Sequence, residues 1–563
     1  YSYQRITRNE NGRNLKTYTI MKKNLTFLII TTLLISCNNN LIKKWENYDE
    51  SNEIKMNSEN ENKRLQFKRI QSISNDKNQL INGFEKEIFN FLKNEYDFVK
   101  ELVHEKSIPE IQKSVIDGKL TYYKLSLFYL TRIYLIEFDQ EQYLNSIISI
   151  NRNILKEAKN KDKIKNTEIY SLHGIPILLK DNIGFEGLPT TAGAHSLKNN
   201  FTDDASIVKQ LKDKGALILG KTNLSEWANY FCYGCPNGYS AMGGQTLHPY
   251  GRKILDTGGS SSGSGVSTTS NLAAGSLGSE TSGSILSPSS ANSLVGMKPT
   301  IGNISRAGIV PISSTLDTAG PMTKFVIDNI LIYNAINDID PMDEYSVENN
   351  DINLKKVMES KVDVYKIGYY KSFYQRDSLY KNSIDFLEDQ GIKLQGIDAP
   401  KIRLDGFAKI LDEDMRHDLR SYLFSFGNKK LEVEDILTII KYNEMDSIER
   451  APYGQGIFKK IIQDTMSIND FEDLKFKLMT KGNEFFDIPM DKYNLDAVLS
   501  INNYHAGYAA MAHNPCLTIP MKLRKNNEPA GLTIIGKSFQ EQQLYEIGYF
   551  FEKTYEGRIP PQN

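Results

Sequence analysis

One stretch, from Gly258 to Pro288, constrains what this chain can fold into more than any other. It reads GGSSSGSGVSTTSNLAAGSLGSETSGSILSP, and only Val266 interrupts its glycines, serines and threonines before Asn271. A run so poor in apolar side chains is not expected to fill a core, whereas glycine lets the backbone approach a ligand and hydroxyls offer nucleophiles. A flexible Gly/Ser linker is the alternative. The apolar Leu272-Ala-Ala and the later Leu294-Val-Gly-Met-Lys-Pro favour an ordered, functional segment.

Four pieces of the sequence resemble the amidase signature family. Ser260 and Ser284 lie 24 positions apart, in a Gly-Gly-Ser-Ser block and a Gly-Ser-Ile block, as the family's two key serines do. The other pieces are HGIPILLKDN (173–182), LVGMKPTIGNISR (294–306) and STLDTAGPMT (314–323). The resemblance is closest to secreted bacterial and plant amidases and peptide amidases. It implies an α/β/α fold with a mixed central β-sheet covered by helices on both faces.

The resemblance also divides the chain. It implies an amidase domain over residues 81–563, with a family-like core at 107–345 and 485–555. Residues 345–480 are charged and rich in helical spacing. They are expected to form a divergent helical region that shapes the substrate pocket.

Lys180, Ser260 and Ser284 are the candidate catalytic residues. Lys180 ends the apolar run 175–180, which suits a strand buried on both faces, although a lysine in such a place is more commonly solvated. The resemblance implies a Ser–cis-Ser–Lys triad: Ser284 is the nucleophile, Ser260 follows a cis peptide bond and bridges, and Lys180 is the general base. An exposed lysine, with a pKa of about 10.4, stays protonated at neutral pH. The base must therefore be enclosed, because burial lowers that pKa.

The backbone N–H groups of Thr281, Ser282, Gly283 and Ser284 are expected to form the oxyanion hole. Donors of this kind typically contribute about 3 kcal/mol each to transition-state stabilisation. Leu286 stands where many family members have arginine, which weakens the case for an anionic substrate. The implied reaction hydrolyses a carboxamide to a carboxylate and ammonia or an amine through an acyl-enzyme, and it requires no metal and no cofactor.

The segment that begins at Met21, MKKNLTFLIITTLLISC, is expected to be a signal peptide. Its apolar run of eleven residues is too short for a membrane-spanning helix, which needs about 20. Leu34-Ile-Ser-Cys37 resembles a bacterial lipobox and implies lipidation of Cys37; a secretory signal with a chance cysteine is the alternative. Residues 1–20 are then a non-native or mis-called extension and 21–36 the signal peptide. Residues 37–80 are a polar tether, because their composition cannot bury enough apolar surface to fold alone.

Periodicity predicts several further elements. Helices are expected over 81–105, after Pro109, after an N-cap at Thr121, and over 147–158. Near the end of the chain, Ala530-Gly-Leu-Thr-Ile-Ile-Gly is expected to be a strand, and 539–551 a helix.

Cys232 and Cys235 form a CxxC pair. No second CxxC and no paired histidines accompany it, which argues against a zinc site. A disulfide and two free thiols both stay open. Cys516 is expected to be a small buried residue.

Composition limits the partners. The 68 basic and 69 acidic residues balance, so there is no basic footprint for nucleic acid. We expect a serine amidase held in the bacterial cell envelope by a lipid on Cys37, acting on a small-molecule or peptide amide. One alternative is an A-type subunit of the tRNA-dependent amidotransferase, which the lipobox argues against. The others are an esterase, which acyl-enzyme chemistry also allows, and an inactive lipoprotein that uses the fold for binding, which the intact Lys180, Ser260 and Ser284 argue against.

Overall fold

The computed structural model describes residues 41–562. Its contacts divide the chain into two units, residues 1–44 and 45–563. In the first unit, the described residues 41–44 contain no helix or strand. The expected extension, signal peptide and Cys37 lie outside the described residues. Within residues 41–562, no helix has the length and apolarity needed to cross a bilayer.

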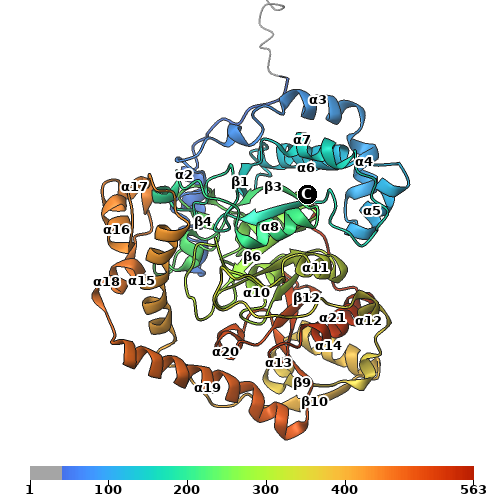
Figure 1. The fold of residues 1–563 in the computed structure, drawn as a ribbon, viewed down its shortest axis with the longest axis vertical. Coiled ribbons are helices and arrows are strands. Elements are labelled where there is room, and N and C mark those ends of the chain that lie inside the picture. Colours follow the sequence, from blue (N-terminus) through green and yellow to red (C-terminus); the bar gives the residue numbers. More distant parts are fainter. Residues whose placement is uncertain (1–40, 563) are drawn as a thin grey trace, which may run out of the picture. The chain divides into compact units, whose positions relative to one another are not determined.

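The second unit is built on one mixed sheet of eleven strands (Figure 1). Strand β2 pairs in parallel with β3 and β6, whereas β6 pairs antiparallel with β8. The predicted strand ending at Lys180 is confirmed as β2, and the predicted strand at 530–536 as β13. In spatial order the strands are β1 (Ile147–Ile150), β3 (Leu217–Thr222), β2 (Pro176–Lys180), β6 (Gly275–Glu280), β8 (Thr318–Thr323), β7 (Val295–Lys298), β12 (Cys516–Leu523), β13 (Pro529–Ile535), β11 (Ala497–Ile501), β9 (Lys366–Tyr370) and β10 (Lys393–Ile397).

Helices cover both faces of this sheet, as expected. Adjacent residues of β12 show the two faces, because successive side chains of a strand point in opposite directions. The Thr518 hydroxyl bonds Ser290 of α10 (Leu286–Ala291), whereas Leu517 packs beside Gly548 of α21 (Glu541–Tyr555). Helix α9 (Ser262–Thr269) contacts α10, and α11 (Val326–Tyr333) contacts α21. The fold is the predicted α/β/α arrangement.

The Gly/Ser-rich stretch lies inside the molecule, so the expectation that it would not fill a core is wrong. All eight residues of α9 are buried. Its hydroxyls are satisfied within the fold: Ser264 donates to the Leu277 carbonyl of β6 at 3.0 Å, and Thr268 bonds Ser276 at 2.8 Å. A side chain at Gly278 would collide with Ser261, since a Cβ there would lie 2.9 Å from its hydroxyl oxygen. Small residues therefore let α9 pack directly on the sheet.

Residues 45–80 pack against the body of the second unit, so the predicted tether is wrong over this range. Trp45, 7% exposed, lies edge-on to Tyr143, with ring centroids 5.0 Å apart. The backbone N–H of Lys68 donates to the Tyr453 hydroxyl at 2.7 Å. The segment is too polar to fold alone, but it carries enough apolar residues to dock on an existing surface; Leu65, Phe67, Ile70 and Leu80 are buried with Trp45.

Two other expectations need correction. Residues 147–158 form strand β1 followed by helix α7, not one helix: the Asn151 side chain accepts from the Asn153 N–H at 2.9 Å and turns the chain between them. Residues 345–480 are not wholly helical, because β9 and β10 extend the sheet at one edge.

The predicted N-cap at Thr121 is confirmed, since its side chain accepts from the Lys124 N–H. The predicted helices after residue 81, after Pro109 and near 539–551 are also present. The remaining helices are α2 (Ser51–Asn57), α3 (Glu85–Asn94), α4 (Tyr96–Val103), α5 (Ile108–Ile116), α6 (Tyr122–Glu137), α7 (Ile154–Lys161), α8 (Ser206–Asp213), α12 (Leu354–Glu359), α13 (Lys371–Arg376), α14 (Ser378–Asp389), α15 (Phe407–Ser425), α16 (Ile436–Glu444), α17 (Ser447–Arg450), α18 (Gly456–Gln463), α19 (Ile468–Tyr493) and α20 (Ala506–Met511), with short 3₁₀ turns at Lys63–Leu65, Lys77–Leu80, His195–Leu197, Glu226–Asn229 and Val362–Val364.

Candidate active site

Lys180 is the last residue of β2, and its side chain is completely buried. Its Nζ lies 2.8 Å from Ser260 Oγ, 2.9 Å from Ser279 Oγ and 3.1 Å from the Ser279 carbonyl oxygen. All three neighbours are neutral. Burial lowers the pKa of Lys180 to about 7, although the negative charges of Asp317 and Glu280 oppose the shift. A lysine in this environment is neutral often enough at physiological pH to accept a proton.

Ser260 and Ser284 lie near the two ends of the signature stretch. Ser260 is fully buried just before α9, and the Gly259–Ser260 peptide bond is cis, as predicted. Ser284, 9% exposed, follows β6, and its carbonyl accepts from the Ser261 N–H at 3.2 Å. Over residues 41–562 the structure gives no hydrogen bond between the Ser260 and Ser284 hydroxyls. Lys180 therefore bonds Ser260 directly. Among the described residues, Ser284 is connected to this pair only through the hydrogen bond that its carbonyl accepts from the N–H of Ser261, the next residue.

The Glu280 carboxylate organises the turn that presents Ser284. It accepts the N–H groups of Gly283 at 2.6 Å, Ile285 at 2.7 Å and Leu286 at 2.9 Å. Gly283 has φ of +95°, a left-handed conformation that suits glycine. Burial raises the pKa of Glu280, and these three donors oppose that rise.

This arrangement changes the expected oxyanion hole. The Gly283 N–H already donates to Glu280, so the prediction that it is available to substrate is wrong for this structure. The N–H groups of Thr281, Ser282 and Ser284 have no acceptor among the described residues, and they remain the predicted donors. Leu286, at the position where arginine is common, is buried among apolar side chains and adds no charge.

Asp317 connects the nucleophile turn to a neighbouring loop. One of its oxygens accepts from the Thr281 hydroxyl at 2.5 Å, and the other from the N–H groups of Ile312 at 2.8 Å and Ser313 at 3.0 Å. These contacts satisfy the partly buried carboxylate through hydrogen bonds from within the fold. They also hold the loop 312–317 against the turn that carries Ser284.

A cleft of about 380 Å³ begins beside these groups. Ser279 and Thr281 line its inner end, and Arg306, Asp343, Asp418 and Phe426 line other parts of it. This volume is in the range of pockets that enclose small-molecule ligands. Helix α15, from the divergent region, supplies one wall, which agrees with the expectation that this region shapes the pocket.

The sequence reasoning missed Ser279, Glu280 and Asp317. Ser279 and Glu280 lie inside the signature stretch, but one serine among many carries no signal of its own. Glu280, however, is the one acidic residue just before Gly283 and Ser284. A carboxylate in that place can accept the free N–H groups of a turn, so it could have predicted this contact. Asp317 lies in the matched piece 314–323, but its role becomes visible only from its contacts in the folded protein.

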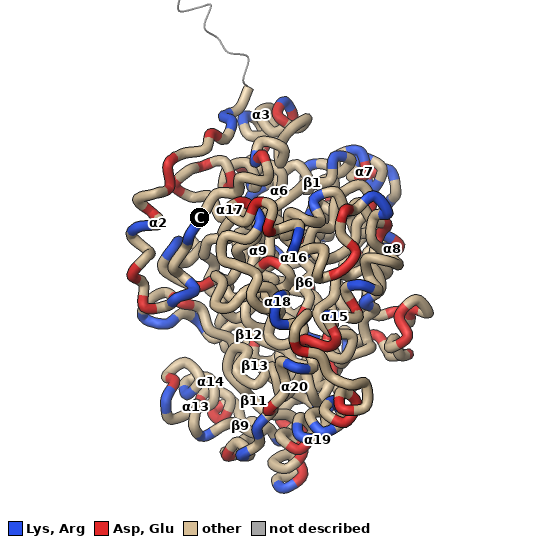
Figure 2. Tube along the Cα trace, turned by 90° about the vertical axis from the view of Figure 1, so that its left-hand side faces the viewer, with Lys and Arg blue, Asp and Glu red and all other residues tan. Residues whose placement is uncertain are grey.

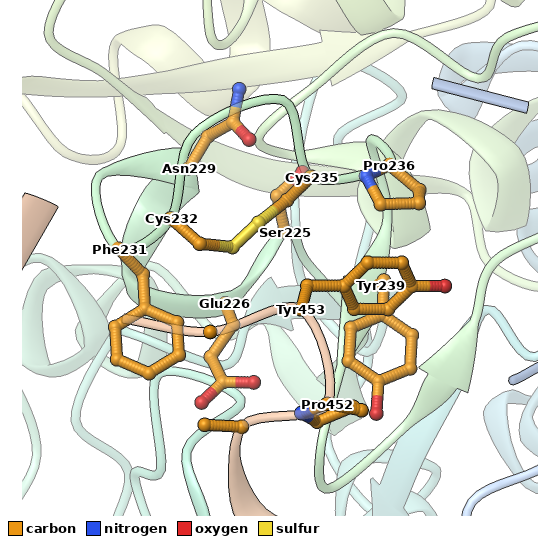
Figure 3. Close-up of a pocket in the computed structure, with 12 residues that line it drawn as sticks. Ser225, Glu226, Asn229, Phe231, Cys232, Cys235, Pro236, Tyr239, Pro452 and Tyr453 are labelled. Atoms are coloured by element: carbon orange, nitrogen blue, oxygen red, sulfur yellow. A yellow bond between two sulfur atoms is a disulfide. The ribbon is translucent and has the colours of Figure 1, made fainter. Parts of the chain in front are cut away.

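A second cavity lies near Cys232 and Cys235, which are joined by a disulfide bond in the structure (Figure 3). Figure 3 shows the disulfide on one side and the Glu226, Tyr239 and Tyr453 side chains around the space. At about 10 Å³ this cavity has room for about one water molecule and not for a substrate. Cys516, the buried free thiol, begins β12. In the described part of the chain, no group of three or more His, Cys, Asp or Glu side chains is placed to hold a metal ion.

Comparison with known proteins identifies the family of this chain. The Amidase family model matches residues 129–455. The chain is 31% identical to a probable amidase of Arabidopsis thaliana, over 82% of this chain and 92% of the relative. It is 30% identical to the A-type subunit of the glutamyl-tRNA(Gln) amidotransferase of Caldanaerobacter subterraneus, over 82% and 97%. Among solved structures, native peptide amidase from Stenotrophomonas maltophilia superimposes with a TM-score of 0.75 at 30% identity, over 82% of this chain and 99% of that one. The chain therefore belongs to the amidase signature family and is an amide-hydrolysing enzyme.

Proposed function

We propose that this protein is a serine amidase in which Ser284 is the nucleophile and Lys180 the general base, acting through Ser260. The observation that carries the proposal is the 2.8 Å contact between the buried Lys180 Nζ and Ser260 Oγ, with no carboxylate bonded to the amine. A serine hydroxyl needs an adjacent base to become nucleophilic, and a Ser–Lys pair can supply it.

The proposed steps use these groups in turn. The Ser284 hydroxyl proton passes to Ser260, whose own proton passes to Lys180, as Ser284 Oγ bonds to the amide carbon. The carbonyl oxygen becomes an oxyanion, which the N–H groups of Thr281, Ser282 and Ser284 stabilise. Lys180 returns a proton through Ser260 to the leaving nitrogen, and ammonia or an amine departs. Water then attacks the acyl ester by the same relay, which releases the carboxylate and regenerates Ser284.

The substrate is proposed to be a primary carboxamide of a small molecule or a peptide. Support comes from the cleft volume and from likeness to an enzyme described as a peptide amidase. We also propose a location in the bacterial cell envelope through a lipid on Cys37. That proposal rests on the sequence 34–37 alone, since Cys37 lies outside the described residues.

Ammonia release from a panel of aliphatic, aryl and peptide C-terminal amides tests the function. Turnover by the wild-type protein, lost in Ser284→Ala and Lys180→Met, is expected. Ser287→Ala, three positions along the chain, is the matched control and should keep its activity. A folded wild-type protein that hydrolyses esters but no amide would contradict the amidase assignment. If a folded wild-type protein turned over no substrate, labelling of Ser284 by a covalent serine probe would separate an enzyme with an unusual substrate from an inactive binding protein.

A further inference from the structure

The charged side chains that line the cleft are unbalanced. Among the described residues that line it, one cation, Arg306, faces four carboxyl groups, those of Asp317, Asp343, Glu344 and Asp418. Over the whole chain the two signs nearly cancel, and Figure 2 shows acidic and basic residues interspersed along the trace. The acidic excess is therefore a local property of the cleft.

The charge of Arg306 is already paired within the cleft wall, and three of its five N–H donors are engaged there. Its Nε and one terminal nitrogen pair with the two oxygens of Asp343 at 2.9 Å and 2.8 Å, and its other terminal nitrogen bonds the Ser314 carbonyl. A two-point contact of this kind is the strongest pairing available to arginine. The guanidinium therefore holds Asp343 and Ser314 together in the cleft wall, and it neutralises the charge of Asp343.

Asp418 is the cleft carboxyl group that lacks such compensation. It projects from α15, is partly buried, and accepts the Ser314 N–H at 2.5 Å. No cationic side chain in residues 41–562 forms an ion pair with it. Burial and the nearby Asp414 raise the pKa of Asp418 to about 7. A buried carboxylate without a counter-charge is costly, and a cationic ligand would relieve that cost.

Asn182 gives independent evidence for a ligand that donates hydrogen bonds. Its side chain is 2% exposed, and it lines the cleft beside the catalytic groups. The Asn182 amide nitrogen donates to Ser279 Oγ at 2.9 Å and to the Val310 carbonyl at 3.3 Å, but its Oδ1 atom has no donor among the described residues. The Val310 carbonyl can only accept, which fixes the orientation of the amide group. A buried acceptor of this kind is normally satisfied, so the cleft offers a place for an N–H or O–H group at this point.

We infer that the cleft selects carboxamides whose acyl portion carries an ammonium or guanidinium group, and that Asp418 pairs with this group. The inference rests on the proposed amidase function and specifies its substrate class. The scissile amide lies at the end of the cleft lined by Asn182, Ser279 and Thr281, where Asn182 Oδ1 can accept a substrate N–H. The cation reaches toward α15. Anionic amides are disfavoured, because Arg306, the cation that lines the cleft, is already paired.

Matched amides test this inference. The ω-amino amides from 4-aminobutanamide to 6-aminohexanamide are each compared with the neutral alkanamide of equal length and with the corresponding dicarboxylic monoamide. At least one ω-amino amide should have a kcat/KM about tenfold or more above that of its neutral partner, with the anionic amide lowest. Asp418→Asn keeps the acceptor for Ser314 and removes the charge, so it should lower kcat/KM for the ω-amino amide more than for its neutral partner and thereby abolish the preference. Asp473→Asn, an exposed carboxylate on α19, is the control and should keep the preference.

Binding keeps the two proposals separable. Calorimetry with Ser284→Ala measures the affinity for both amides of each pair without turnover. A lower Kd for the cationic amide supports the inference, whether or not any amide is hydrolysed. Ser284-dependent hydrolysis with equal affinity for both partners would retain the amidase and overturn the cationic selectivity. A preference for the anionic amide, or a cationic preference that survives Asp418→Asn, would also overturn it.

Discussion

Two neighbouring strands of the sheet each carry a buried lysine, and the two amines bond to different kinds of groups. On β2, Lys180 meets two serine hydroxyls and a carbonyl. On β3, Lys221 lies 3.4 Å from the Asp181 carboxylate and 2.5 Å from the Ile183 carbonyl oxygen. Both are fully buried, and burial lowers the pKa of both, but at Lys221 an adjacent carboxylate opposes the change. Burial alone does not make a lysine a base: Lys180 also bonds the Ser260 hydroxyl, whereas Lys221 pairs with the Asp181 carboxylate.

The largest effect is expected at Lys180. Lys180→Met keeps the length and apolar stem, removes the base, and should reduce kcat by about 10³–10⁴-fold. Its midpoint of urea unfolding should stay unchanged or rise, because a buried amine without an ionic partner is removed. Steady-state ammonia release measures the loss of kcat, and urea unfolding measures the change in stability. A loss of activity that only follows a loss of folded protein would break the comparison.

Lys221→Met should show the opposite pattern. It leaves the buried Asp181 without its partner and is expected to lower the free energy of unfolding by about 3–5 kcal/mol. The folded fraction should retain wild-type kcat. Adding Asp181→Asn should recover part of the stability, which denaturant unfolding of the double variant measures. If Lys221→Met were stable but inactive, Lys221 rather than Lys180 would be the catalytic lysine.

A smaller effect is expected at Ser279, the second hydroxyl on Lys180. Ser279→Ala removes the 2.9 Å contact and leaves the one to Ser260. We expect kcat to fall about fivefold, since a hydrogen bond that orients the base contributes about 1 kcal/mol. The comparison with Ser260→Ala, which interrupts the relay, should show a much larger loss. Equal losses would mean that Ser279 also transfers protons.

The smallest effect concerns pH. Since only the neutral amine of Lys180 accepts a proton, kcat/KM should rise as pH increases through about 7 and then level off. Asp317 and Glu280 are the carboxyl groups whose charges raise the pKa of Lys180. Asp317→Asn keeps the contact to Thr281 and removes one of these charges, so the profile should move to lower pH by less than about one unit. A shift to higher pH would contradict the proposed electrostatics.

The sequence was informative where chemistry and local pattern coincide. The apolar run before Lys180 predicted β2, and the spacing of Ser260 and Ser284 predicted two segments that the structure brings to one side of that strand. Strand β1 was mistaken for part of a helix, because four residues are too few to show alternation. Its isoleucines also continue at helical spacing into α7.

The substrate cleft could not be predicted in the same way. Arg306, Asp343 and Asp418 are far apart in the chain and meet only when α15 packs beside the loop 312–317. No local pattern distinguishes Asp418 from the other acidic residues of α15. Nor could composition show that residues 45–80 would dock, because docking depends on the surface that the rest of the chain presents.

The docked N-terminal segment has a consequence for where the enzyme could work. Trp45 packs against Tyr143, and residues 38–44 separate it from Cys37 in the sequence. Fully extended, seven residues span at most about 25 Å. If Cys37 carries the lipid that the sequence predicts, this short connection keeps Trp45 within about that distance of the lipid anchor. It would then sample substrates from a thin layer next to the membrane rather than from the whole compartment.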